Sequence, residues 1–235
     1  LVSRTAGNGY VTGTEFEGYN YFIGLGWDKG DHNFQFMLTG APQTHNQRTT
    51  SFFNTATLAQ YLQYGEKYNF NHGYLNGEEF NWRKNFYHKP VTSLNWTWDI
   101  NDNSSLTTSA YVSFGRGGGT GDIGRLPGFR FASNSIFRDP RNGQVLWDDI
   151  VRYNQGQAVV FSDGNTYQRD LTDGNINDRS NNGLTRRASV NSHNWFGILS
   201  NYNTQLNDNL SLDFGIDLRK YKGIHYRRID YLLGA

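Results

Sequence analysis

Apolar and polar positions alternate along six segments of the chain, and these segments come in three consecutive pairs. The pairs occupy residues 19–41, 91–114 and 195–219. A period of two is typical of β-strands, whose successive side chains point to opposite faces. Short runs rich in Asn, Asp and Gly, which suit tight turns, separate the two segments of each pair. The pattern therefore predicts three antiparallel hairpins. Their turns are expected near residues 28–32, 101–104 and 207–209.

Two long connections separate the hairpins, one at 42–90 and the other at 115–194. Connections in compact domains usually have about 4–6 residues, and much longer ones are generally functional. Aromatic residues are frequent in these connections. Because burying one such ring contributes about 1.5–3 kcal/mol, we expect both connections to be folded and packed on each other.

Two short helices are predicted within the connections. The first covers 57–64, with Asn54 or Thr55 as its N-cap and Gly65 as its stop. The second covers 145–153. The rest of both connections is rich in turn-forming residues, so no other helix is predicted there.

Short turns that alternate with long connections are typical of outer-membrane β-barrels, which have short periplasmic turns and long extracellular loops. Each segment is close to the roughly 9–11 residues that a tilted strand needs to cross the bilayer. The predicted fold class is therefore all-β, with about six strands of an antiparallel transmembrane barrel. The residues expected to point outward to lipid are Leu94, Trp96, Val112, Ile198, Leu212, Phe214 and Ile216.

Aromatic residues lie at both ends of the predicted spans, like the girdles of such barrels. Those near the short turns are Trp27, Phe34 and Trp98, and those near the long connections are Tyr19, Tyr21, Phe114 and Phe196. Six strands would leave two open edges, which hydrocarbon does not tolerate, so we expect the chain to be part of a larger barrel. A passive porin-like barrel and a soluble carbohydrate-binding β-sandwich are the alternatives, because a sandwich strand also alternates.

Composition narrows the function classes further. The 235 residues carry 22 Lys and Arg against 21 Asp and Glu, a net charge of +1, which gives no electrostatic basis for binding nucleic acid. The chain has no Cys, which excludes disulfides, thiolate metal sites and a cysteine nucleophile. Aromatic residues make up 16%, which argues against disorder. The low mean hydropathy of −0.71 fits spans that hold only a small part of the chain.

No motif in the sequence predicts catalysis. Gly119, Gly121 and Gly124 match Gly-x-Gly-x-x-Gly, but Pro127 follows closely and prevents the helix that a dinucleotide site needs. We therefore interpret this segment as a glycine-rich loop that leaves a strand.

A second motif resembles a calcium loop. Asp173, Asn175 and Asn177 have the spacing of its first three ligands, but Leu184 stands where the bidentate Glu would be. They are at most a weak cation site. We expect no enzymatic activity, no cofactor and no other metal site.

The first connection is crowded with Tyr, Phe and Trp among Asn residues, a combination that suits sugars or peptides. The alternative is that these rings pack the connection into a folded cap. The residues proposed to contact a ligand are Tyr74, Trp82, Tyr87, Arg116 and Arg125.

Several segments resemble the barrel of SusC/RagA-like TonB-dependent receptors of Gram-negative outer membranes. These segments are GYLNGEEF at 73–80, NWRKNFYHKP at 81–90, SFGRGGGTG at 113–121 and NSHNWFG at 191–197, together with 7–10 and 14–20 near the start. The resemblance extends over most of the chain.

This resemblance implies that residues 1–235 are part of a 22-stranded barrel domain and that they do not include the plug domain or TonB box of such receptors. It implies nutrient uptake energised through TonB in the outer membrane, with a SusD-type surface lipoprotein, a glycan or peptide substrate and the lipid bilayer as partners. It supplies no catalytic residues and no substrate-binding residues.

Overall fold

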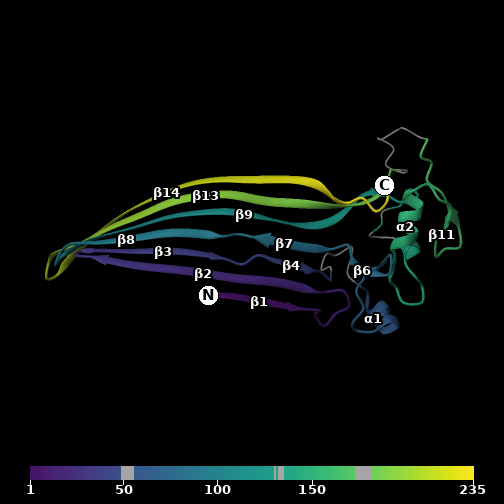
Figure 1. Cartoon of the computed structure of the whole chain (residues 1–235), viewed down its shortest axis with the longest axis horizontal. Coiled ribbons are helices and arrows are strands. Elements are labelled where there is room, and N and C mark those ends of the chain that lie inside the picture. The colour runs from purple at the N-terminus through teal and green to yellow at the C-terminus, as the bar shows by residue number, and fades with distance from the viewer. Residues whose placement is uncertain (49–55, 130, 132–134, 173–181) are drawn as a thin grey trace.

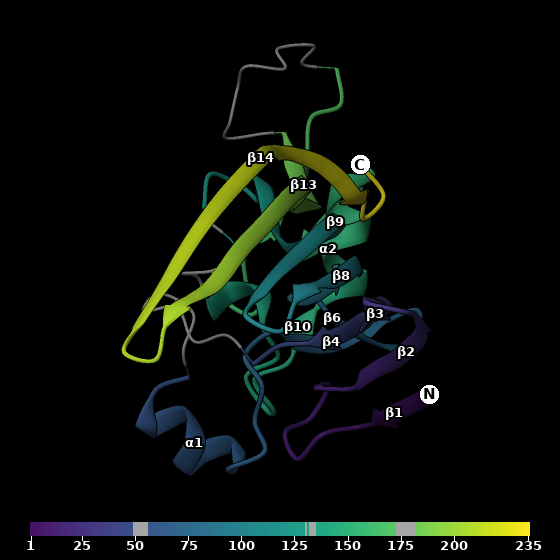
Figure 2. The same ribbon diagram turned by 90° about the vertical axis from the view of Figure 1, so that its left-hand side faces the viewer.

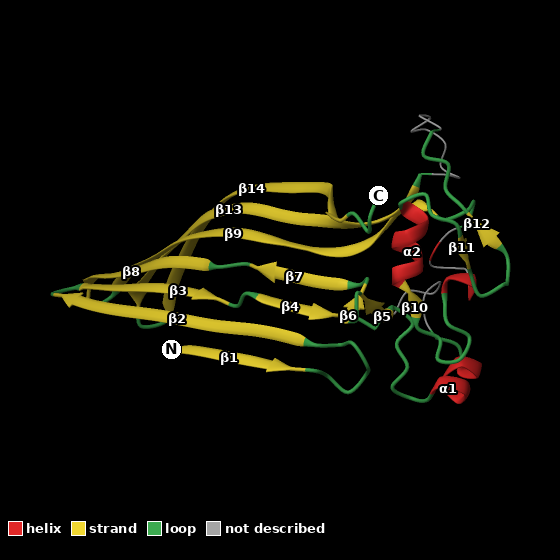
Figure 3. Ribbon diagram, turned by 45° about the vertical axis from the view of Figure 1, so that its right-hand side comes forward, coloured by secondary structure: helices red, strands yellow, loops and turns green. Residues whose placement is uncertain are grey.

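The chain is all-β, and most of it forms one long antiparallel sheet with a folded cap at one end (Figure 1). The computed structural model describes residues 1–48, 56–129, 131, 135–172 and 182–235. The sheet runs along the longest axis of the molecule, and the helices and short strands gather at the end opposite the tight turns (Figure 3).

The long sheet contains nine strands. They are β1 (Val2–Gly7), β2 (Phe16–Lys29), β3 (His32–Gly40), β4 (Gln43–Asn46), β7 (Lys84–His88), β8 (Val91–Asn101), β9 (Ser104–Arg125), β13 (Gly183–Asn207) and β14 (Leu210–Tyr231). β3 and β4 follow one line along β2, with Pro42 in the gap between them, and β7 and β8 follow one line along β9, with Pro90 in theirs. Because proline has no N–H to donate, it interrupts a ladder at such points.

The three predicted hairpins are confirmed. β2–β3, β8–β9 and β13–β14 are antiparallel pairs. Two residues separate the strands in each of them: Gly30–Asp31, Asp102–Asn103 and Asp208–Asn209. β3 also pairs with β8, and β9 with β13, so the hairpins lie side by side in one sheet (Figure 2). β1 and β14 form the two edges of this sheet.

The strands are longer than the alternating pattern predicted. β9 has 22 residues and continues to Arg125, and β13 has 25 residues and starts at Gly183. The second connection therefore spans 126–182 rather than 115–194. The first connection is shortened in the same way, because β4 and β7 lie within 42–90.

The alternating pattern does not predict this extension because the extended part of β9 is rich in glycine, which is unfavourable inside strands. Gly119 and Gly121, which we interpreted as part of a loop, lie inside β9. Side chains of neighbouring strands occupy the space beside several glycines: the His193 ring lies over Gly115, and the Tyr111 ring lies over Gly197. An added methyl group at Gly115 or Gly197 would collide with these rings.

The two faces of the sheet differ sharply. One line of cross-strand neighbours on the first face is entirely apolar: Leu25, Phe36, Leu94, Ala110, Ile198 and Leu218. The next line on the opposite face is mostly polar: Gly26, Gln35, Asn95, Ser109, Leu199 and Asp217. We call these the apolar face and the polar face. All seven residues predicted to point outward lie on the apolar face, and none of them is buried.

The cap contains the only hydrophobic core found among the described residues. Its elements are α1 (Leu58–Tyr64), β5 (His72–Leu75), β6 (Glu78–Asn81), η2 (Ser135–Phe137), β10 (Val145–Leu146), α2 (Trp147–Asn154), β11 (Val159–Val160) and β12 (Thr166–Tyr167). Parallel pairing of β10 with β5 joins the two connections. The buried core residues include Leu126, Phe131, Phe137, Trp147, Ile150, Tyr153 and Leu184. The prediction that the two connections pack on each other is confirmed for the described residues.

Polar side chains strengthen this cap. The buried guanidinium of Arg138 stacks 3.4 Å above the Phe70 ring and donates to the Phe70 carbonyl, and burial lowers the pKa of Arg138 to about 10. Asn154, also buried, bonds both the N–H and the C=O of Leu184 and the C=O of Leu233. These contacts link residues far apart in the sequence.

Both predicted helices form, with shifted starts. The N-cap of α1 is Thr57, not Asn54 or Thr55, because Thr57 and Gln60 form a reciprocal capping box; Gly65 is the C-cap as predicted. α2 begins at Trp147 because the two residues before it pair with β5. Of the helices in the described part, none is long and apolar enough to span a membrane.

Candidate functional site

Trp82, one of the proposed ligand contacts, is part of the cap core. Its side chain is only 3% exposed, its Nε1–H donates to Asn71 Oδ1 at 2.9 Å, and its ring meets that of Phe131 edge-on at 4.9 Å. The proposal that Trp82 contacts a ligand is therefore wrong for this structure. The alternative, that the aromatic residues pack the cap, describes it correctly.

Tyr74 and Arg125 lie apart from the other proposed contacts. Tyr74 on β5 is exposed, and its ring meets the buried His72 ring edge-on at 5.3 Å. Arg125 ends β9, where its backbone N–H donates to Asn182 Oδ1 at 3.0 Å. Neither residue lines the cavity that holds Tyr87 and Arg116, so the five residues do not form one site.

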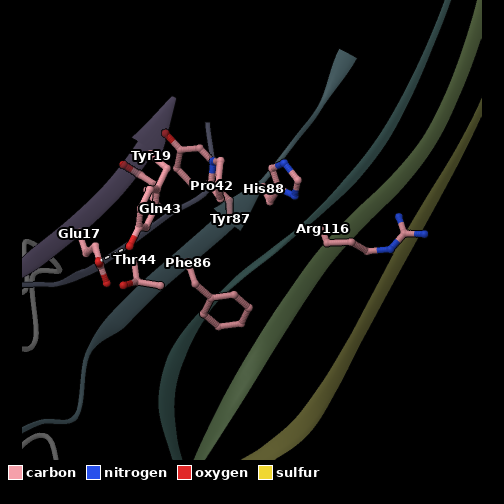
Figure 4. A pocket seen from close by; sticks show the side chains of 9 residues that line it. All are labelled: Glu17, Tyr19, Pro42, Gln43, Thr44, Phe86, Tyr87, His88 and Arg116. Carbon is pink, nitrogen blue, oxygen red and sulfur yellow. Dashed lines mark hydrogen bonds between the residues drawn. The ribbon is translucent and has the colours of Figure 1, made fainter. Parts of the chain in front are cut away.

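Tyr87 and Arg116 both line a cavity of about 320 Å³ at the cap end of the sheet (Figure 4). β7 and β9 place them there, because His88 pairs with Arg116 and Tyr87 with Gly117. The residues lining the cavity are Glu17, Tyr19, Pro42, Gln43, Thr44, Phe86, Tyr87, His88 and Arg116.

The polar groups around this cavity are already engaged with one another. Tyr19 donates to Glu17 at 2.6 Å and Arg4 pairs with Glu17 at 2.9 Å. The Tyr19 bond and then the Arg4 guanidinium lower the pKa of Glu17. Arg116 points away from Glu17 in Figure 4, and its guanidinium donates to Asn194 Oδ1. The cavity therefore offers aromatic surface rather than a free acid–base pair.

A second cavity, of about 410 Å³, lies on the polar face next to the cap. Its lining residues are Gln47, Arg83, Asn85, Phe86, Tyr87, Lys89, Gly117, Gly118, Gly119, Thr120, Arg187, Ser189 and Asn191. We call it the polar-face cleft. The alternating pattern does not indicate this cleft, because it predicts a connection over residues 183–194. The signal was present, since Arg187, Ser189 and Asn191 alternate in step with the later residues of β13.

The weak cation candidates Asp173, Asn175 and Asn177 lie outside the described residues. Across the rest of the chain, no group of three or more His, Asp or Glu side chains is arranged to hold a metal ion. His72 Nε2 lies 3.7 Å from Glu79 Oε2 in the cap, as a pair rather than a group of three. Burial lowers the pKa of His72, and the Glu79 carboxylate opposes that shift.

Comparison with known proteins gives no relatives: no protein-family model, curated protein or solved structure matches the chain.

Proposed function

We propose that this chain forms part of the wall of a transmembrane β-barrel in a Gram-negative outer membrane, and that the barrel takes up glycan or peptide nutrients with energy supplied through TonB. The observation that carries the proposal is the exposed apolar band on one face of a long antiparallel sheet whose other face is polar. The sequence resemblance to SusC/RagA-like receptors supports the energised form of transport and a SusD-type lipoprotein partner.

The apolar band is exposed and crosses several strands. Leu25 is 65% exposed, Ile198 50% and Leu218 64%, and they belong to one line that crosses six strands. Exposed patches beyond a few hundred Å² usually mark a membrane or protein contact. On β14 the band ends at Lys220 and Lys222, as it would at the polar boundary of a bilayer.

Aromatic residues flank the band at both ends. At the turn end, Trp27 stacks on Phe34 with ring centroids 5.4 Å apart, and Phe34 stacks on Trp96 at 6.3 Å. At the cap end, Phe114 meets Phe196 edge-on at 5.6 Å. Rings at these two levels correspond to the aromatic girdles at the two interfaces of a membrane barrel.

The sheet edges also favour a barrel. β14 has 22 residues, and in the part of the chain that the structure describes it pairs only with β13, while β1 pairs only with β2. Unpaired N–H and C=O groups are costly in hydrocarbon, so a sheet in a bilayer must close on itself with further strands. The tight turns would then face the periplasm and the cap the outside.

A soluble β-sandwich would need a second layer over the apolar face. The described residues provide none there, because the hydrophobic core lies in the cap. A passive porin-like barrel would use the same wall, and it differs from the proposed importer in needing no energy.

Two measurements test the proposal. Fractionation should place the protein in the outer membrane, with heat-modifiable mobility on gels. Uptake of its nutrient should stop when TonB is deleted. Recovery in the soluble fraction would refute the barrel, and uptake that continues without TonB would favour the porin.

A further inference from the structure

Positive charge gathers on the polar face where the sheet meets the cap. Arg187 on β13 and Lys89, between β7 and β8, line the polar-face cleft. Arg227 on β14 pairs in register with Ser189, which also lines the cleft. Arg187 donates to the Ser189 hydroxyl at 2.6 Å, which holds its guanidinium at this place.

Within the described part of the chain, these cations have no carboxylate partner at salt-bridge distance. Among the described residues, no Asp or Glu oxygen lies within 4.0 Å of the charged nitrogens of Arg187, Arg227 or Lys89, whereas the adjacent Arg186 pairs with Asp230 at 2.7 Å. The Nε atom of Arg187 is buried and lacks a hydrogen-bond partner within the same part of the chain. An anion in the cleft would relieve this unpaired charge.

The neighbouring cations at the cleft influence the pKa of Arg187. Burial first, and then the positive charge of Arg227, lower the pKa of Arg187; Arg83 acts in the same direction and Asp122 opposes it. Arg187 stays charged at neutral pH, because an arginine side chain is effectively always protonated. A partly buried guanidinium with other cations near it would be stabilised by an anion.

Glycines make room for a ligand beside these charges. Gly117, Gly118 and Gly119 form the floor of the cleft without side chains. A methyl group added at Gly119 would have only the Asn85 amide nitrogen within van der Waals reach among side chains, at 3.6 Å. This part of the floor is open to a ligand.

An aromatic cluster continues the same face of β13 away from the cap. His193 stacks on Tyr221 with ring centroids 5.9 Å apart, and Trp195 meets Tyr111 edge-on at 5.8 Å. Ser189, Asn191, His193 and Trp195 occupy every second position of β13, so the cleft lining and the rings follow one another along the same face of the strand. Amides and hydroxyls, which both donate and accept, lie between the charges and the rings.

We propose that the polar-face cleft binds the acidic group of an anionic oligosaccharide, with Arg187, Arg227 and Lys89 as its cationic contacts and the aromatic cluster as the platform for adjoining sugar rings. This inference rests on the proposed function, since it places the substrate on the inner wall of the barrel. An oligosaccharide fits better than an acidic peptide because the cleft lining is dominated by charged, amide, hydroxyl and glycine groups rather than by apolar pockets for side chains.

The test is calorimetric titration of the intact protein, purified from outer membranes in detergent, with trigalacturonate and with neutral maltotriose. Trigalacturonate is expected to bind at least about 10-fold more tightly, as one charge-assisted hydrogen bond would produce, and to weaken as salt is raised. Equal affinity for both sugars would overturn the proposal. Equal binding of triglutamate would overturn the sugar assignment.

Matched variants locate the site. Arg187→Gln with Arg227→Gln should weaken trigalacturonate binding at least about 10-fold. Gly119→Glu should abolish it by placing a negative charge on the floor. Lys222→Gln is the control, because Lys222 is on β14 like Arg227 but belongs to the apolar face and does not line the cleft. Unchanged binding in both cleft variants, or equal loss in the control, would overturn the proposal.

Heat-modifiable mobility of each variant shows that it is assembled. This readout also separates the hypothesis of an outer-membrane barrel from the hypothesis that the cleft binds an acidic sugar. A protein that is not an outer-membrane barrel fails it before any sugar is added, whereas an assembled barrel without preference for the acidic sugar refutes only the substrate class.

Discussion

Replacement of Phe214 by arginine is the sharpest perturbation of the apolar face. Phe214 is 61% exposed and lies midway between Leu210 and Leu218, the two ends of the uninterrupted apolar run on this face of β14. Eight residues at about 3.3 Å extend about 26 Å, which a tilt near 45° reduces to about 19 Å of depth. Phe214 therefore lies near the middle of the band.

An arginine at that depth costs roughly 2–4 kcal/mol in a membrane barrel. Because 1.36 kcal/mol corresponds to a factor of ten, the folded state should lose about 30- to 900-fold in its equilibrium with the unassembled state. In a soluble protein the same exposed position would tolerate arginine, since surface substitutions usually change stability by less than about 0.5 kcal/mol.

The assay is the folded fraction in outer-membrane preparations, measured by heat-modifiable gel mobility. Phe214→Leu controls for loss of the ring and should assemble normally. Ser211→Arg places the same charge on the polar face of the same strand, where the side chain reaches water, and should also assemble. Equal tolerance of Phe214→Arg and Ser211→Arg would mean that this face of β14 does not meet lipid, and the reasoning would fail.

Three further predictions concern the cap and the sheet. Asn154→Ala should destabilise the cap by about 3 kcal/mol, because three buried backbone groups lose their partner, and limited proteolysis should then cleave the cap first. Gly197→Ala should cost about 1–3 kcal/mol by colliding with the Tyr111 ring, and the second change Tyr111→Ser should restore much of the folded fraction in urea titrations. Burial lowers the pKa of His72, so the unfolded cap binds a proton more readily than the folded one. The contribution of His72 to stability should therefore be complete above about pH 6.5 and should decline as the pH falls below it. Thermal melts across this pH range measure the decline, and the melting temperature of His72→Asn should depend less on pH.

Controls for these predictions come from the same chain. Gly26→Ala should cost less than Gly197→Ala, because nothing lies within 4 Å of the added methyl group. Asn165→Ala, at an exposed turn, should leave the cap intact. A cap that resists protease in Asn154→Ala, or a Gly197→Ala variant as stable as Gly26→Ala, would contradict the corresponding prediction.

The hairpins could be predicted because alternation and turn chemistry are local. Each strand segment carries its own period of two, and runs such as Asn101–Asn103 fit a tight turn without reference to the rest of the chain. The extension of β9 and β13 could not be predicted in this way. The glycines of β9 accept side chains such as those of His193 and Arg187, which arrive from another strand.

The site residues were predictable only in part. Tyr87 and Arg116 line the same cavity, because β7 and β9 pair in register. Trp82 and Tyr87 lie in the same aromatic, Asn-rich segment, yet Trp82 lies in the core. Phe131 of the second connection packs against the Trp82 ring, and such a contact between distant segments cannot be read from the local sequence. The polar-face cleft is lined by residues of β7, β9 and β13 together, so no single segment of the sequence indicates it.

The most direct test of the membrane-facing band uses the absence of cysteine in the chain, which allows spin labels to be attached at single introduced cysteines. Labels at each position from 211 to 218 of β14 would be examined in the assembled protein for access to oxygen, which concentrates in lipid, and to a water-soluble nickel chelate. The barrel predicts oxygen access that peaks at the even positions and chelate access that peaks at the odd positions. Equal chelate access at both sets of positions would contradict it.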